Sequence, residues 1–131
     1  MEIPEVFRKL IVEVDTGLVD LLDGKVLIYE KQDYRIVVLN PKTPIWKQII
    51  YFLLARKGLA SRTIIPTEAA TPKEIVMALE LNPNSVRPFL RQLVDTGLLA
   101  TVNIGAKDQR ATIGYFVPSQ VVSRLADKLN G

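Results

Sequence analysis

The chain has 131 residues, which suits one compact domain or a small domain with an appended subdomain. It contains no Cys and no His. These absences exclude disulfides, zinc sites built from Cys and His, cysteine nucleophiles and every catalytic triad with a histidine base. Hydrophobic residues make up 48% of the sequence and charged residues 24%, as in ordinary folded proteins. We therefore predict a folded protein that is not an enzyme and that needs no cofactor.

The net charge of +3 is unevenly distributed. Residues 1–42 carry six Lys/Arg and eight Asp/Glu, whereas residues 43–131 carry eleven and six. The basic excess therefore lies in the second part, where a polyanionic partner is to be sought. No apolar stretch reaches the ~20 residues that span a bilayer, and the N-terminus does not read as a secretory signal. We expect a cytoplasmic protein with no membrane contact.

The first segment, residues 3–22, repeats apolar residues at a spacing that predicts a helix. Within it, residues 10–14 read LIVEV, and this β-branched run also fits a short strand. Both interpretations stay open from the sequence.

A β-hairpin is predicted after the turn at Asp23 and Gly24, from the runs KVLIYE and YRIVVL. Its strands carry apolar side chains on both faces. Such a ribbon has to be covered on both sides, by the N-terminal helix and the rest of the chain or by a second subunit. The sequence NPKTP at residues 40–44 then interrupts both strand and helix and marks the end of this extension, residues 1–42.

The next helix is predicted to begin with Thr43 as its N-cap and Pro44 in its first position. We expect it to end with Arg56 and Lys57 as a basic last turn and Gly58 as the stop signal.

A connector over residues 59–70 follows, in which residues 63–65 fit one short strand. Thr71 and Glu74 then have the spacing of a capping box, which predicts a helix over residues 72–81.

Another cap, Asn82, precedes a helix predicted over residues 83–96 and closed by Gly97. Its inward face consists of apolar residues at helical spacing: Val86, Leu90 and Leu93. Strands are predicted over residues 98–104 and 111–117, joined by a polar tip. Finally, Ser119 is expected to cap a short helix with the apolar stripe Val122, Leu125 and Leu129.

This α+β order over residues 43–118 resembles a winged helix-turn-helix. The segment TPKEIVMALELNPNSVRPFLRQLVDTGLL carries most of the resemblance and is similar to the helix-turn-helix of small bacterial and archaeal transcriptional regulators. The resemblance implies a DNA-binding domain over 43–118, a possible dimerisation element in 1–42 and a C-terminal helix over 119–131. It also implies that the protein binds double-stranded DNA as a homodimeric transcriptional regulator.

The residues of the helix over 83–96 agree with this interpretation. At about 100° per residue, one side collects polar and charged groups opposite the apolar face: Asn84, Arg87, Pro88, Arg91 and Asp95. Arg pairs with guanine and Asn with adenine in the major groove. Ser85 and Gln92 lie at the flanks, and we expect free backbone N–H groups over residues 82–85 to meet a phosphate.

The loop over residues 105–110 would be the wing. By resemblance, Lys107 and Arg110 would contact the DNA backbone or the minor groove. Lys73, in the first turn of the preceding helix, would add a phosphate contact. Pro88 removes a backbone N–H, so the helix is expected to kink or tighten there.

Three rival hypotheses remain. The first is a metal site, because carboxylate oxygens can hold a divalent ion and four acidic residues lie close together in the sequence, namely Glu13, Asp15, Asp20 and Asp23. The solvated face of a helix explains these residues better. Trp46, Tyr51 and Phe52 suggest a ligand pocket, although such aromatic stripes more often belong to the core. The third is a winged-helix protein-interaction module of a replication, transcription or segregation complex, docking through the hairpin. An apolar interface of that kind would not weaken with salt as a DNA complex does.

Overall fold

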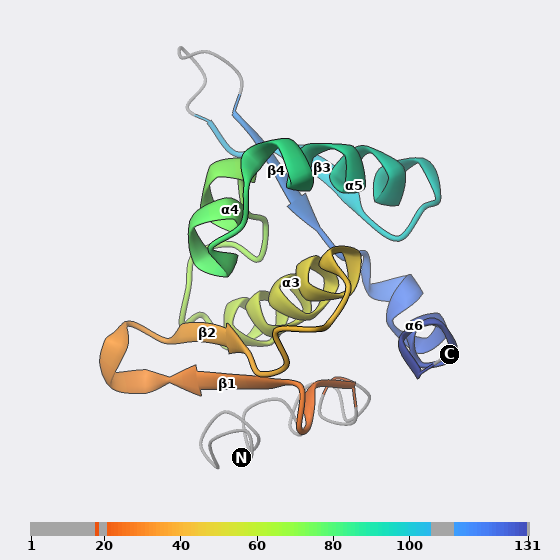
Figure 1. Cartoon of the computed structure of the whole chain (residues 1–131). Coiled ribbons are helices and arrows are strands. Elements are labelled where there is room, and N and C mark those ends of the chain that lie inside the picture. The colour runs from red at the N-terminus through yellow and green to blue at the C-terminus, as the bar shows by residue number, and fades with distance from the viewer. Residues whose placement is uncertain (1–17, 19–20, 106–111, 131) are drawn as a thin grey trace.

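The computed structural model describes residues 18, 21–105 and 112–130. Over this part the chain is α+β, with four α-helices and two antiparallel hairpins. Figure 1 shows the elements in chain order, which are β1 (Val26–Tyr29), β2 (Arg35–Val38), α3 (Ile45–Ser61), α4 (Pro72–Leu79), α5 (Pro83–Asp95), β3 (Ala100–Asn103), β4 (Ile113–Phe116) and α6 (Val122–Asn130).

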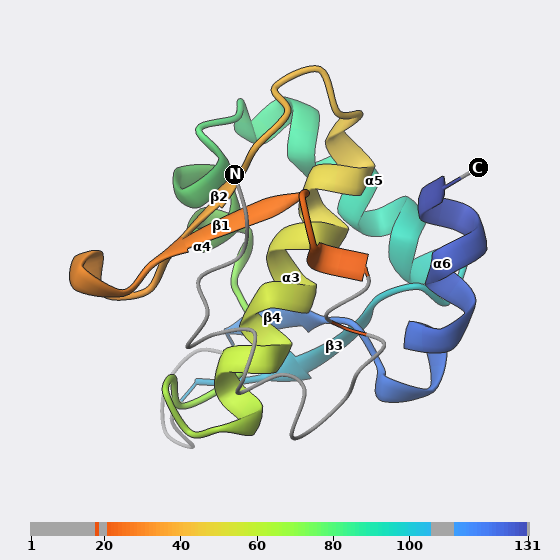
Figure 2. The same cartoon turned by 90° about the horizontal axis from the view of Figure 1, so that it is seen from below.

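Helix α3 is the centre of the molecule. The β1–β2 hairpin crosses one side of it, and α4 and α5 pack on the other (Figures 1 and 2). Because α3 is buried on almost every side, its sequence is apolar all round and not only along one stripe. A single apolar core runs from Leu18 to Leu129, across the predicted boundary at residue 42.

The predicted β1–β2 hairpin is confirmed, with Val26 opposite Val38 and Ile28 opposite Ile36. Val26, Ile28 and Ile36 are buried in the common core. The opposite face is covered less completely, because Leu27 and Val37 are half-buried and Tyr29 is exposed. Of the predicted N-terminal helix, Leu18, Leu21 and Leu22 are helical and buried, and the rest lies outside the described residues.

The predicted bounds of α3 are wrong at both ends. The helix begins at Ile45 after Pro44, and Thr43 contributes its carbonyl oxygen, not its side chain, to Gln48 Nε2 at 2.7 Å. At the other end the helix continues through Gly58 to Ser61. A glycine costs a helix only ~1 kcal/mol, and the helix that continues past it buries Leu59 completely.

The strand predicted at residues 63–65 is also wrong. Thr63 has φ +58°, in the left-handed region, so the backbone turns there. The strand-like contact comes later, at Ala70. Its N–H donates to the Tyr115 carbonyl at 3.0 Å and its carbonyl accepts from the Tyr115 N–H at 2.8 Å. One residue of the connector thus pairs with β4.

The predicted starts of α4 and α5 are confirmed. In the capping box, Thr71 Oγ1 accepts from the Glu74 N–H at 3.2 Å, and Glu74 Oε1 accepts from the Thr71 N–H at 3.0 Å. Asn82 caps α5, and Gly97 follows that helix with φ +82°. Helix α4 ends at Leu79, earlier than predicted, because Glu80 adopts a left-handed conformation.

The last three elements were predicted in the right kind and order, but both strands are shorter than the predicted ranges 98–104 and 111–117, and the predicted cap of the last helix is wrong. Strands β3 and β4 pair antiparallel, with Thr101 opposite Tyr115. Ser119 does not cap α6 but begins a 3-10 turn, Ser119–Val121, that leads into the helix. The predicted apolar stripe of α6 is buried: Val122, Leu125 and Leu129.

Gly114 lets β4 approach the connector. A Cβ atom at this position would lie 2.9 Å from the Ala69 Cβ and 3.2 Å from the Ile104 Cδ1. The Ala69 Cβ is bonded directly to the backbone, so it cannot move aside by a side-chain rotation. Position 114 therefore has no room for a side chain, and glycine is required there.

We predict that Gly114→Ala destabilises the fold by about 1–3 kcal/mol, the usual cost of overpacking. Urea unfolding followed by circular dichroism measures this. Adding Ala69→Gly removes the atom in the way, so the double variant should be more stable than the sum of the single changes predicts. Thr101→Ser, an exposed change on the paired strand, is the control. If the changes in unfolding free energy of the two single variants simply add in the double variant, positions 69 and 114 are not in close contact.

Candidate nucleic-acid interface

The outward face of α5 is the candidate interface. The helix is started by an N-cap at Asn82. Asn82 Oδ1 accepts from the Asn84 N–H at 2.8 Å, and the Asn82 carbonyl accepts from the Ser85 N–H at 2.9 Å. Pro83 has no N–H to offer. The expectation that Asn84 and Ser85 have free N–H groups for a phosphate is therefore wrong. Of the predicted range 82–85, this leaves only the Asn82 N–H and the side chains for a phosphate contact.

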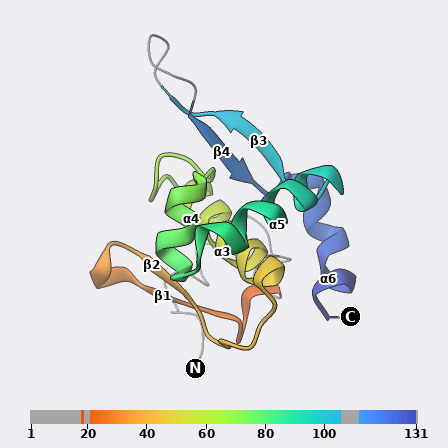
Figure 3. The same ribbon diagram turned by 45° about the horizontal axis from the view of Figure 1, so that its top comes forward.

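The two faces of α5 separate as predicted. Its inward residues Val86, Leu90 and Leu93 are buried. The predicted DNA-contacting residues lie on the other side, where Ser85 is half-buried and four side chains are exposed: Asn84, Arg87, Arg91 and Gln92. Helix α5 lies across α3 (Figure 3). The side chains of its outward face are open to solvent.

An open hollow runs along this face, lined by Arg87, Pro88, Arg91, Gln92 and Asp95. Helix α5 continues without interruption through Pro88, whose ring is exposed between the two arginines. Within the described part of the chain, neither guanidinium makes a hydrogen bond or an ion pair. Two planar, bidentate donors are thus presented to solvent on one side of one helix.

The remaining predicted site residues divide into two groups. Lys73 is exposed in the first turn of α4, one residue after Pro72. Lys107 and Arg110 lie outside the described residues, although the β3–β4 strands that lead to their loop are in place (Figure 3).

Three other basic side chains of the second part hold the scaffold together. Arg56 donates to three carbonyls of the connector, through Nε to Glu68 at 3.1 Å and through Nη2 to Thr67 and Ala69 at 3.0 Å each. Burial lowers the pKa of the Arg56 guanidinium, and the negative charge of Glu74 opposes this shift. Arg56 is therefore a half-buried residue whose donors are held by the connector.

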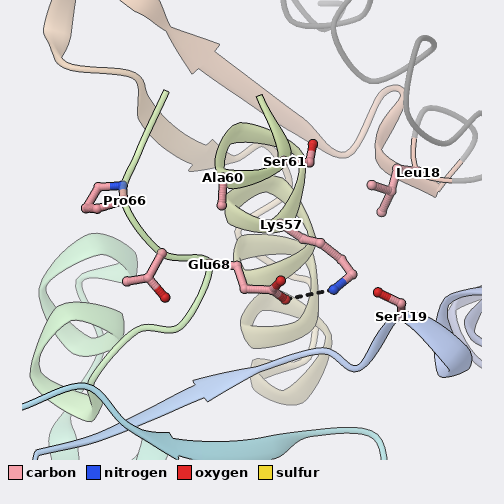
Figure 4. Close-up of a pocket in the computed structure, with 8 residues that line it drawn as sticks. Leu18, Lys57, Ala60, Ser61, Pro66, Glu68 and Ser119 are labelled. Carbon is pink, nitrogen blue, oxygen red and sulfur yellow. Dashed lines mark hydrogen bonds and ion pairs between the residues drawn. The ribbon is translucent and has the colours of Figure 1, made fainter. Parts of the chain in front are cut away.

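The neighbouring Lys57 is buried and pairs with Glu68 at 2.8 Å. Figure 4 shows this ion pair in a polar hollow between α3, the connector and Ser119. Near the start of α3, Lys47 Nζ donates to the Leu129 carbonyl at 3.0 Å and so holds the end of α6. The predicted basic last turn at Arg56 and Lys57 is thus wrong, since the helix continues to Ser61 and both side chains bond to the connector.

One feature of the sequence indicates that Arg56 contacts the protein and not solvent alone. Arg56 follows Phe52 by four residues, on the same apolar spacing, and its guanidinium lies 5.9 Å from the Phe52 ring centroid. A charged residue on a buried face needs fixed partners, and the connector carbonyls supply them.

The rival sites fare differently. Of the acidic group, only Asp23 is described, and no cluster of three or more acidic residues suitable for a metal ion exists among the described residues. Tyr51 and Phe52 are core residues, and burial raises the pKa of the Tyr51 phenol. Trp46 is half-buried and lines a separate hollow beside α5 and α6. The three aromatic residues therefore share no common pocket.

Comparisons with protein-family models, with curated proteins and with solved structures found no match to this chain. Among the described helices, none combines the length and the apolar character needed to cross a membrane.

We predict that Arg56→Lys destabilises the protein by about 3 kcal/mol, because one ammonium cannot replace a planar fork on three carbonyls and leaves acceptors unsatisfied. Chemical denaturation measures the loss. Arg124→Lys, an exposed change on α6, should stay within about 0.5 kcal/mol of the parent. Equal stabilities for the two variants would show that the connector does not depend on Arg56.

Proposed function

We propose that the chain binds double-stranded DNA through a winged helix-turn-helix over residues 43–118, as a homodimeric transcriptional regulator. In this proposal α5 enters the major groove. The β3–β4 hairpin carries the wing toward the backbone or the minor groove. Residues 105–110 form its tip, with Lys107 and Arg110 as contacts.

The arrangement of elements supports the proposal. Helices α4 and α5 pack against each other and are joined by a turn of three residues, 80–82, which is the connection length of a helix-turn-helix. The bridge between Ala70 and Tyr115 adds a third, one-residue strand on the edge of β4 that β3 does not occupy. This bridge fits the short strand that precedes the helix-turn-helix in the proposed fold.

The observation that carries the proposal is the outward face of α5. Arg87 and Arg91 are exposed, lie one turn apart and line one hollow. A major groove about 12 Å wide admits one helix, and arginine reads guanine there with two hydrogen bonds. Asn84, nearer the start of the helix, has the amide that pairs with adenine.

Electrostatics favour an approach by the start of α5. Asp95 lies at the far end of the same hollow and repels phosphate there. Lys73, exposed on α4, supplies a charge suited to the DNA backbone. Phosphate contacts are therefore expected from Lys73 and the wing, and base contacts from α5.

A second candidate is a protein-interaction module with little DNA affinity. Its support is the outward face of the β1–β2 hairpin, where Tyr29 is 39% exposed beside the half-buried Leu27 and Val37. The same face would serve the homodimer. Two copies with their α5 helices ~34 Å apart would bind an inverted repeat.

The first test is fluorescence anisotropy of the protein with a random-sequence duplex, from low to physiological salt, with the solution mass recorded. We expect a dimer whose log K falls by about 0.9 per phosphate neutralised for each unit of log salt. Absence of binding at low salt would overturn the DNA proposal and favour the interaction module.

The second test uses a sequence selected from a random pool. Arg91→Ala should weaken binding to the selected site by about 1–3 kcal/mol while leaving non-specific binding nearly unchanged. Lys73→Ala and Lys107→Ala should weaken all sequences alike and lower the salt slope by about 0.9 each. Arg124→Ala, an exposed arginine on α6, is the matched control. If Arg91→Ala behaves like that control, Arg91 is not a base-reading residue.

A further inference from the structure

A hollow of about 400 Å³ lies where the start of α3, the end of α5 and the end of α6 meet. Figures 2 and 3 show α6 beside the C-terminal part of α5. Two half-buried aromatic rings line it, Trp46 from α3 and Phe89 from α5. Leu93 and Leu98, both buried, complete the apolar lining. None of these residues belongs to the proposed DNA-reading face.

The polar groups of the hollow are few and carry one sign of charge. Lys128, exposed in the last turn of α6, lines it, and no acidic residue does so among the described residues. Outside the lining, the Lys47 ammonium lies 5.6 Å from the Trp46 ring centroid. Lys47 is engaged with the Leu129 carbonyl, but its charge still adds to the positive potential at the hollow. The Thr96 hydroxyl is already used, since it donates to the Leu93 carbonyl at 3.1 Å.

An apolar, aromatic lining with a small number of polar groups is the usual composition of a small-molecule site. Two rings on different helices favour a flat apolar body between them, because aromatic groups pack by offset or edge contacts. One cation at the rim favours a single acidic group at the end of that body. A zwitterion or a cation would find no carboxylate in the described lining.

We propose that this hollow binds a small aromatic carboxylic acid, with its ring against Trp46 and Phe89 and its carboxylate toward Lys128. The inference does not rest on the proposed DNA binding. An effect of the ligand on DNA binding would rest on that proposal. It is expected because Gln92 lines both this hollow and the hollow on the outward face of α5. A ligand here would therefore contact the reading helix from its side.

The chain provides its own probe, because Trp46 is its single tryptophan. The experiment is a titration of the full chain with 3-phenylpropionate, read by Trp46 fluorescence with excitation at a wavelength that the ligand does not absorb. We expect a saturable change. The neutral 3-phenylpropionamide should bind about threefold more weakly, which is the size of one exposed ion pair. Propionate, which has the acid but no ring, should give no saturable change at the same concentrations.

Two variants locate the site. Lys128→Gln should remove the preference for the acid over the amide and leave amide binding unchanged, whereas Arg124→Gln, one turn earlier on α6 and outside the lining, should keep the preference. Phe89→Leu keeps an apolar side chain but loses the ring, so both ligands should bind more weakly. Circular dichroism checks that each variant is folded.

The proposal is overturned if the fluorescence change does not saturate, or if acid and amide bind equally to the parent protein. It is also overturned if Lys128→Gln and Arg124→Gln behave alike. The titration contains no DNA, so its result stands whether or not the chain binds DNA. If DNA binding is found, adding 3-phenylpropionate to the anisotropy measurement tests the consequence through Gln92 separately.

Discussion

The guanidinium of Arg56 fixes the course of the second half of the chain. It donates to three successive connector carbonyls, from Thr67 to Ala69, because a guanidinium holds five N–H donors in one rigid plane. The next residue, Ala70, pairs with β4, and the one after it caps α4. A short turn then leads to α5. The placement of the proposed reading helix thus depends on a contact made by a half-buried arginine of α3.

Part of the basic excess in residues 43–131 is used inside the protein and does not face a partner. Lys47, Arg56 and Lys57 are used within the protein, on a carbonyl, three carbonyls and a carboxylate. Only the Lys57 charge is paired with an opposite charge. The Lys47 and Arg56 charges remain, but their donors are held by carbonyls of the protein and are not presented to a phosphate. Arg87 and Arg91 have no such partner among the described residues. Net charge therefore overstates the surface available to DNA, while the exposed pair on α5 supports the proposal more directly.

The elements that the sequence predicted well are those set by neighbouring residues. The Thr71 capping box, the Asn82 cap and the left-handed Gly97 each act over a few positions, so α4 and α5 start and stop close to their predicted ends. Gly58 and residues 63–65 were misjudged because distant contacts decide them. Burial of Leu59 extends α3 past its glycine, and pairing with Tyr115 selects Ala70 as the bridging residue. The outward face of α5 was predictable by helical period, whereas the hollow formed by Trp46, Phe89 and Lys128 joins parts of the chain that no local pattern connects.

Helix α5 has three surfaces with different tasks. Its inward residues anchor it on α3, its outward arginines face solvent, and its side, through Phe89 and Gln92, borders the hollow next to α6. A rigid helix cannot shift at one surface without shifting at the others, because packed interiors transmit displacement. If the side hollow binds a ligand and the outward face binds DNA, as proposed, the two events would be coupled through the position of one helix. By linkage, any ligand that changes the DNA affinity of such a helix has its own affinity changed by DNA to the same degree.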